Sequence, residues 1–241
     1  SEEAGLRYEG YGLGVNIFDV NEDGWQDIYV SNDYLTNDLL YINNGDGTFT
    51  NKIWDYFKHQ THSAMGNDVA DINNDALPDI ITLDMLPGNH YRQMKMLPES
   101  KFSNYRNNEV YGYQYQYMRN TLQLNRGKGV NGEHVFSEIG LLSGVYASEW
   151  SWTPLLIDLD NDGWRDLMIS NGFPRDIMDL DYSDYRGKLS LAFDKKKILA
   201  SIPEVEVPNM VFHNNGDLTF DDYTYKWGLS EATYSSGAAF D

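Results

Sequence analysis

A nine-residue acidic segment occurs three times in this chain, and it constrains the fold more than any other feature of the sequence. The three copies span residues 19–27, 71–79 and 158–166. Each has an aspartate or asparagine at positions 1, 3, 5 and 9, and two of the three have glycine at position 6. Asp241 lies where a fourth copy would begin. Segments that recur in the same surroundings indicate a repeat architecture rather than three isolated loops.

Apolar segments with strand-like composition surround each copy in the same order and predict four strands per unit. Turns such as Asn44-Gly45-Asp46-Gly47 tolerate positive φ and predict a hairpin between the third and fourth strands. From Phe49, Phe136 and Phe220 in the expected fourth strands, the next acidic copy begins after 22, 22 and 21 residues. The expected strands are residues 14–18, 27–31, 39–43 and 48–50, then 65–70, 79–83, 121–125 and 134–137, then 152–157, 166–170, 210–213 and 218–221.

Units of four antiparallel strands, joined by short hairpins and repeated along the chain, are the composition of a β-propeller. We therefore predict an all-β fold with three propeller blades and the start of a fourth, all part of one domain. The blades are expected at residues 12–52, 64–138 and 150–223, with the fourth starting near residue 235.

Two insertions, at residues 86–119 and 172–208, are expected between the second and third strands of the second and third blades. The first carries Tyr111, Tyr113, Tyr115 and Tyr117 at a period of two. These tyrosines are a candidate platform for stacking sugar rings, or alternatively a strand with one face packed on the propeller. The second insertion predicts a short amphipathic helix packed on the blade, because apolar residues recur at helical spacing around three lysines. Those apolar residues are Leu189, Ala192, Phe193, Leu199 and Ile202, and the lysines are 195–197.

The acidic segments are candidate calcium sites. Ca²⁺ takes six to eight oxygen ligands, which side chains at positions 1, 3, 5 and 9 and a backbone carbonyl at position 7 can supply. An EF-hand is excluded because position 12 is Val30, Thr82 or Ile169 instead of glutamate, and the flanks are strand-like. A solvated hairpin tip is the simpler explanation for one such loop, but three copies favour metal. The expected ligands are Asp19, Asn21, Asp23, Trp25 and Asp27; Asp71, Asn73, Asp75, Leu77 and Asp79; and Asp158, Asp160, Asp162, Trp164 and Asp166.

The three sites are not expected to bind calcium equally. The third segment has four carboxylates, whereas Asn21 and Asn73 replace one carboxylate in the other two. The second segment also has Ala76 where the others have glycine, and a left-handed alanine costs about 1 kcal/mol relative to glycine. The predicted order of affinity is therefore the third segment, then the first, then the second.

The pattern of a strand, Asp-x-Asp/Asn-x-Asp-Gly-x-x-Asp and an apolar strand resembles the FG-GAP or VCBS repeats of integrin α-subunit propellers and of many bacterial exported proteins. Residues 27–33, 43–49 and 66–71 look most similar to bacterial relatives of cartilage acidic protein. The resemblance covers almost the whole chain except the two insertions. It implies a propeller of about seven blades and calcium-ligand roles for the acidic segments, from which Ala76 departs.

Composition narrows the classes of function. The formal net charge of −19 disfavours nucleic acid and anionic membranes, whose phosphates attract basic surfaces. The chain has no cysteine, so thiolate metal sites and disulfides are excluded. No apolar run is long enough for a membrane span, and no export leader opens the chain, so we expect any leader to lie outside it.

The sequence favours a calcium-stabilised binding or adhesion module of an exported protein, located outside the cell, on its surface or in the periplasm. Its partner is expected to be a protein or glycan, with further blades or domains supplied from outside this chain. The alternative is a propeller-based polysaccharide lyase or hydrolase. No nucleophile elbow, His-Glu-x-x-His or phosphate-binding glycine loop occurs, and the histidines at 59, 62, 90, 134 and 213 are scattered, so we do not predict an enzyme.

Overall fold

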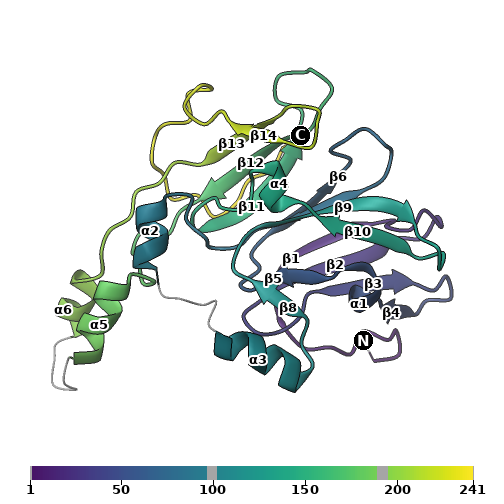
Figure 1. Cartoon of the computed structure of the whole chain (residues 1–241), viewed down its shortest axis with the longest axis horizontal. Coiled ribbons are helices and arrows are strands. Elements are labelled where there is room, and N and C mark those ends of the chain that lie inside the picture. Colours follow the sequence, from purple (N-terminus) through teal and green to yellow (C-terminus); the bar gives the residue numbers. More distant parts are fainter. Residues whose placement is uncertain (1, 97–101, 189–194, 241) are drawn as a thin grey trace.

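The computed structural model describes residues 2–96, 102–188 and 195–240, and its main elements are three four-stranded antiparallel sheets (Figure 1). Within each sheet, neighbouring strands follow one another in the chain. Sheet one contains β1 (Tyr11–Phe18), β2 (Asp27–Asp33), β3 (Leu39–Asn43) and β4 (Phe49–Asn51); sheet two contains β6 (Asn67–Ala70), β7 (Asp79–Thr82), β9 (Thr121–Lys128) and β10 (His134–Glu138); sheet three contains β11 (Ser151–Ile157), β12 (Asp166–Asn171), β13 (Met210–Asn214) and β14 (Phe220–Asp222). All twelve strands overlap the segments that the sequence predicts.

Each acidic segment is the turn between the first and second strands of its sheet. We call residues 19–27 loop one, residues 71–79 loop two and residues 158–166 loop three. The last residue of each loop opens the second strand and pairs with the last residue of the first strand, as in Phe18 with Asp27 and Ile157 with Asp166. This common register gives the three loops equivalent positions in the fold.

Sheet two is packed between the other two sheets. Alternate side chains of a strand point to opposite faces, so neighbouring residues of β7 enter different cores. Ile80 packs with Tyr29 and Leu40 of sheet one, whereas Ile81 packs with Leu167 of sheet three. Full burial of each such aliphatic side chain contributes about 1.5–3 kcal/mol, so the cores hold the sheets together.

Short elements connect the sheets and fill the two insertions. Figure 1 shows α2, α5 and α6 on one side of the sheets, with α3 beside β8. No helix in the described ranges has the length and apolar character needed to cross a bilayer. The elements are α1 (Ile53–Tyr56), β5 (His59–Thr61), α2 (His90–Lys95), α3 (Phe102–Tyr111), β8 (Tyr115–Tyr117), α4 (Gly140–Ser143), α5 (Leu180–Lys188) and α6 (Lys195–Ala200), and β5 pairs in parallel with β8.

The tyrosine row does not form one strand. Tyr111 ends α3, Tyr113 lies in the following turn, and only Tyr115 and Tyr117 lie on β8. The expectation that tyrosines form the packed face is also wrong, because these two are 39% and 37% exposed. Gln114 turns inward instead, where its amide donates to the backbone carbonyls of Ile53 and Phe57.

The second insertion contains two short helices, α5 and α6. Of the residues expected on the packed face of one amphipathic helix, Leu189, Ala192 and Phe193 lie outside the described residues. Leu199, on α6, is 61% exposed and so contradicts that expectation, whereas Ile202 is buried just beyond the helix. A helix of six residues is too short to present a continuous apolar face.

Candidate metal centres

The three loops share one hydrogen-bond pattern. In loop one, the Asp19 carboxylate accepts from the backbone N–H groups of Asp23 at 3.1 Å and Gly24 at 2.7 Å, and Asp23 Oδ1 accepts from Trp25 N–H at 2.8 Å. Loops two and three repeat these bonds. In each, the carboxylate at position 1 accepts from the backbone N–H groups of positions 5 and 6, and the carboxylate at position 5 accepts from the backbone N–H of position 7. The sequence repeat is therefore also a repeat in the geometry of the turn.

The carboxylate at position 9 anchors each loop to its sheet. Asp27, Asp79 and Asp166 are completely buried. Each accepts one hydrogen bond from the backbone N–H of position 2 and another from the backbone N–H of an asparagine in the third strand, which is Asn43, Asn125 or Asn214. Burial raises the pKa of Asp79 to about 7; the two backbone N–H groups act against this rise, and the carboxylates of Asp75 and Asp71 add to it. Burial also raises the pKa of Asp27.

Left-handed backbone is required at position 6 of every loop. The φ angles are 88° at Gly24, 70° at Ala76 and 94° at Gly163. Glycine adopts this conformation without a steric penalty, whereas Ala76 has a Cβ that disfavours it. Loop two therefore carries the strain that its sequence predicts.

The donor set fits a hard divalent cation. In loop three, one carboxylate oxygen from each of Asp158, Asp160 and Asp166 lies within 4.8 Å of the others. The side chains expected as ligands in all three loops offer only oxygen, which suits Ca²⁺ better than Zn²⁺. Hydrogen bonds to the loop backbone also satisfy these oxygens, so the same geometry suits a turn without metal. The ligand role of the Trp25, Leu77 and Trp164 carbonyls stays a prediction.

The side chain at position 7 packs on the hairpin between the third and fourth strands. A Cβ built on Gly45 would lie 3.1 Å from Trp25 Nε1, and one on Gly216 would lie 2.9 Å from the Trp164 ring. Both glycines also have positive φ. Position 7 thus fixes the loop to the neighbouring hairpin.

His213 is a neighbour of loop three that sequence reasoning did not select. Its Nδ1 lies 3.1 Å from Asp166 Oδ1 and 3.6 Å from Asp160 Oδ2, and its ring stacks on Tyr223. Ile42 and Leu124 hold the equivalent place in β3 and β9, beside loops one and two. Alignment of the three third strands shows this difference, so the signal was present in the repeat.

The tyrosines predicted to bind ligand lie apart from the loops. Tyr115 and Tyr117 belong to the two-stranded sheet formed by β5 and β8, whereas the loops join strands of the three larger sheets. Tyr115 stacks on Tyr105 of α3, with ring centres 5.1 Å apart and an interplanar angle of 4°. Binding of ligand by Tyr111, Tyr113, Tyr115 or Tyr117 stays a prediction.

Comparison with known protein families gives one match. No curated protein matches the chain. The matched segment, residues 19–82, contains loops one and two together with the strands and turns between them. Over these residues the chain is similar to the family described as FG-GAP-like repeat.

Proposed function

We propose that this chain is a calcium-binding part of an FG-GAP/VCBS-type β-propeller, in an exported or cell-surface protein that binds a protein or glycan. The observation that carries the proposal is the recurrence of one oxygen-rich loop, with the same hydrogen bonds, at the same turn of three sheets. Calcium here would be structural, holding the turn between the first two strands. The FG-GAP-like match over residues 19–82 supports the same assignment.

The way in which the sheets pack supports the propeller. The first strands lie beside one another: Asn16 of β1 donates to the Asn67 carbonyl at 2.9 Å, and Gly66, next to β6, donates to the Trp152 carbonyl of β11 at 2.8 Å. Equivalent residues of these strands differ in burial, because Leu156 is 3% exposed and Ile17 is 64% exposed. A further blade packed on β1 would cover Ile17 as sheet two covers Leu156.

An exported location follows from the same proposal. Exposed loops with three or four carboxylates suit the millimolar calcium found outside cells, whereas cytosolic calcium would leave weak sites empty. Ligand binding is expected away from the calcium loops, on surfaces that the insertions build. We propose a binding module rather than an enzyme.

Removal of calcium should lower the melting temperature of the chain. A ligand that binds only the folded state at a hundredfold excess over its Kd stabilises that state by about 2.7 kcal/mol per site. For a chain of this size, this corresponds to a shift of roughly 5–10 °C per occupied site. Differential scanning calorimetry with excess calcium and with excess chelator measures the shift, and Asp46→Asn, in a hairpin outside the loops, should preserve it. Equal melting temperatures in the two buffers would refute the proposal.

Single-loop variants should show different calcium affinities. Asp162→Ala is expected to remove the tightest site, since loop three has four carboxylates and a glycine at position 6. Asp23→Ala should remove the intermediate site, and Asp75→Ala the weakest, because Ala76 is strained. Isothermal titration calorimetry of the three variants measures the order, and loss of the tightest site in Asp75→Ala would contradict it.

A further inference from the structure

A pocket lies between sheet three and the connection from sheet two. Its volume is about 610 Å³, within the range of small-ligand sites. Both insertions contribute to its wall: Arg92 comes from α2 in the first, and Glu206 lies at the end of the second. Met210 and Phe212 of β13 give it an apolar side. The pocket therefore depends on the two segments by which sheets two and three differ from sheet one.

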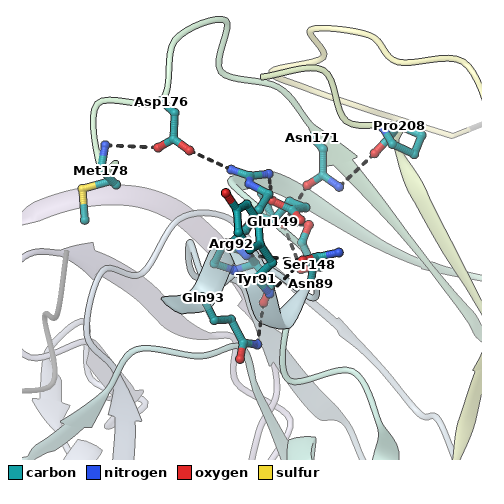
Figure 2. A network of polar contacts seen from close by, with 12 residues as sticks. Asn89, Tyr91, Arg92, Gln93, Ser148, Glu149, Asn171, Asp176, Met178 and Pro208 are labelled. Carbon is teal, nitrogen blue, oxygen red and sulfur yellow. Dashed lines mark hydrogen bonds and ion pairs between the residues drawn. The ribbon is translucent and has the colours of Figure 1, made fainter. Parts of the chain in front are cut away.

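Two residues that line this pocket, Arg92 and Glu149, belong to an ion-pair network (Figure 2). The Arg92 guanidinium pairs with the Glu149 carboxylate and, at 3.2 Å, with Asp176 Oδ2. Glu149 is 9% exposed and has a φ of 75°, a conformation that costs energy in a residue with a side chain. Burial raises the pKa of Glu149, and Arg92 opposes that rise. Arg92 is thus already engaged by two carboxylates.

The pocket wall has an excess of negative charge. Glu206 and Asp222 line it in addition to Glu149, whereas Arg92 is its one cationic residue. The Glu206 side chain makes no hydrogen bond or ion pair within the described residues. The pocket is not built for a metal ion, because its carboxylates do not belong to the groups of described residues whose ligand atoms converge within 4.8 Å. Separated carboxylates beside an apolar wall suit an extended organic cation.

An equivalent groove on sheet one provides an internal comparison. It measures about 270 Å³ and runs along Leu39 and Tyr41 of β3, which correspond to Met210 and Phe212 of β13. No charged residue lines it. The acidic character therefore belongs to the pocket of sheet three and does not follow from sheet packing alone.

We propose that this pocket, between sheet three and the connection from sheet two, binds an alkylammonium or alkylguanidinium group, with its aliphatic part on Met210 and Phe212 and its charge beside Glu206 and Asp222. Long basic groups combine these two properties, since their stems are apolar and their ends are charged. The aromatic ring of Tyr225 also lines the pocket and can contact a cation through its face. The cation can be a free amine or a lysine or arginine side chain of a partner.

The test is titration of the whole chain with two probes, 1,5-diaminopentane and lysine blocked at both backbone ends. Pentanol and blocked norleucine serve as their uncharged counterparts. The charged probes should bind more tightly than these, and added salt should weaken their binding. Glu206→Gln and Asp222→Asn should each weaken it about three- to tenfold, the range expected for one nearby charge. Tighter binding of blocked lysine would assign the site to a partner side chain, and tighter binding of the diamine to a free amine.

Two control variants separate this site from general acidity and from the calcium loops. Asp184→Asn removes an exposed carboxylate of α5 outside the pocket, and should leave probe affinity unchanged. Asp162→Ala changes loop three and should also leave it unchanged, so the proposed calcium sites and this pocket succeed or fail separately. No preference for the charged probes, no loss in Glu206→Gln and Asp222→Asn, or an equal loss in Asp184→Asn would overturn the proposal.

Discussion

Asp38→Asn should stabilise the chain at pH 8 by up to about 4 kcal/mol and have little effect near pH 4. Burial is the main reason why the pKa of Asp38 rises from 3.8 to about 7, with the Asp84 carboxylate adding to it and hydrogen bonds from Asn32 N–H and Tyr29 Oη acting against it. The folded chain therefore holds this proton at pH values where the unfolded chain has lost it. Stability falls as pH increases from about 4 to 7, and asparagine removes this contribution.

The repeat explains why asparagine should fit at this position. Asp38 Oδ1 accepts the backbone N–H of Asn32 at 2.8 Å. In the second unit, Asn120 Oδ1 accepts the backbone N–H of Asp84 at 2.8 Å. In the third unit, Asn209 Oδ1 accepts the backbone N–H of Asn171 at the same distance. An uncharged amide thus does in two sheets what a buried carboxyl does in sheet one.

Denaturant unfolding of the parent chain and of Asp38→Asn between pH 4.5 and 8 gives two curves of stability against pH. The difference between the curves measures the contribution of Asp38, because the contributions of other carboxylates are common to both proteins. Asn120→Asp is the reverse control. The stability of this variant should decrease as pH rises. It should also be lower at every pH, because the substitution removes the hydrogen bond that the Asn120 amide donates to Val145 O at 2.9 Å. A stability difference between Asp38→Asn and the parent that stays constant with pH would contradict the assignment.

The repeat made much of the fold predictable. Strand order and loop position follow from a hydrophobic pattern that recurs three times, so errors in one unit are corrected by the other two. Ala76 shows the same for the loops: its equivalence to Gly24 and Gly163 predicted a left-handed backbone, and its φ is 70°.

The insertions were less predictable because no second copy constrains them. The tyrosine alternation suggested one strand, but Gln114 supplies the buried hydrogen bonds and α3 includes Tyr111. Contacts between insertions are equally invisible in a single sequence. Arg92 and Asp176 are 84 residues apart, and only the folded chain brings them together.

Arg92→Gln should destabilise the chain by about 3 kcal/mol at neutral pH, because it leaves the Glu149 carboxylate without its cationic partner. Loss of one member of a buried ion pair costs about 3–5 kcal/mol, and partial exposure of Arg92, 27% for its side chain, places this case at the lower end. Asp176 also loses a partner and lies close enough to raise the pKa of Glu149 further. The cost should grow with pH once Glu149 ionises in the folded parent, which occurs above its ordinary pKa of 4.5 because burial raises that pKa.

A double-mutant cycle isolates this ion pair from other effects of the substitution. In a Glu149→Gln background, Arg92→Gln should cost about 1 kcal/mol or less, since the carboxylate that then loses its guanidinium partner is that of Asp176, whose side chain is 19% exposed. Arg175→Gln is the matched control. Arg175 Nη2 lies 2.9 Å from Glu204 Oε1, and the Glu204 side chain is 66% exposed. Exposed ion pairs of this kind contribute about 0–1 kcal/mol to stability. Equal costs of Arg92→Gln in the parent and Glu149→Gln backgrounds, measured by denaturant unfolding at pH 7, would show that Arg92 acts through packing rather than through its charge.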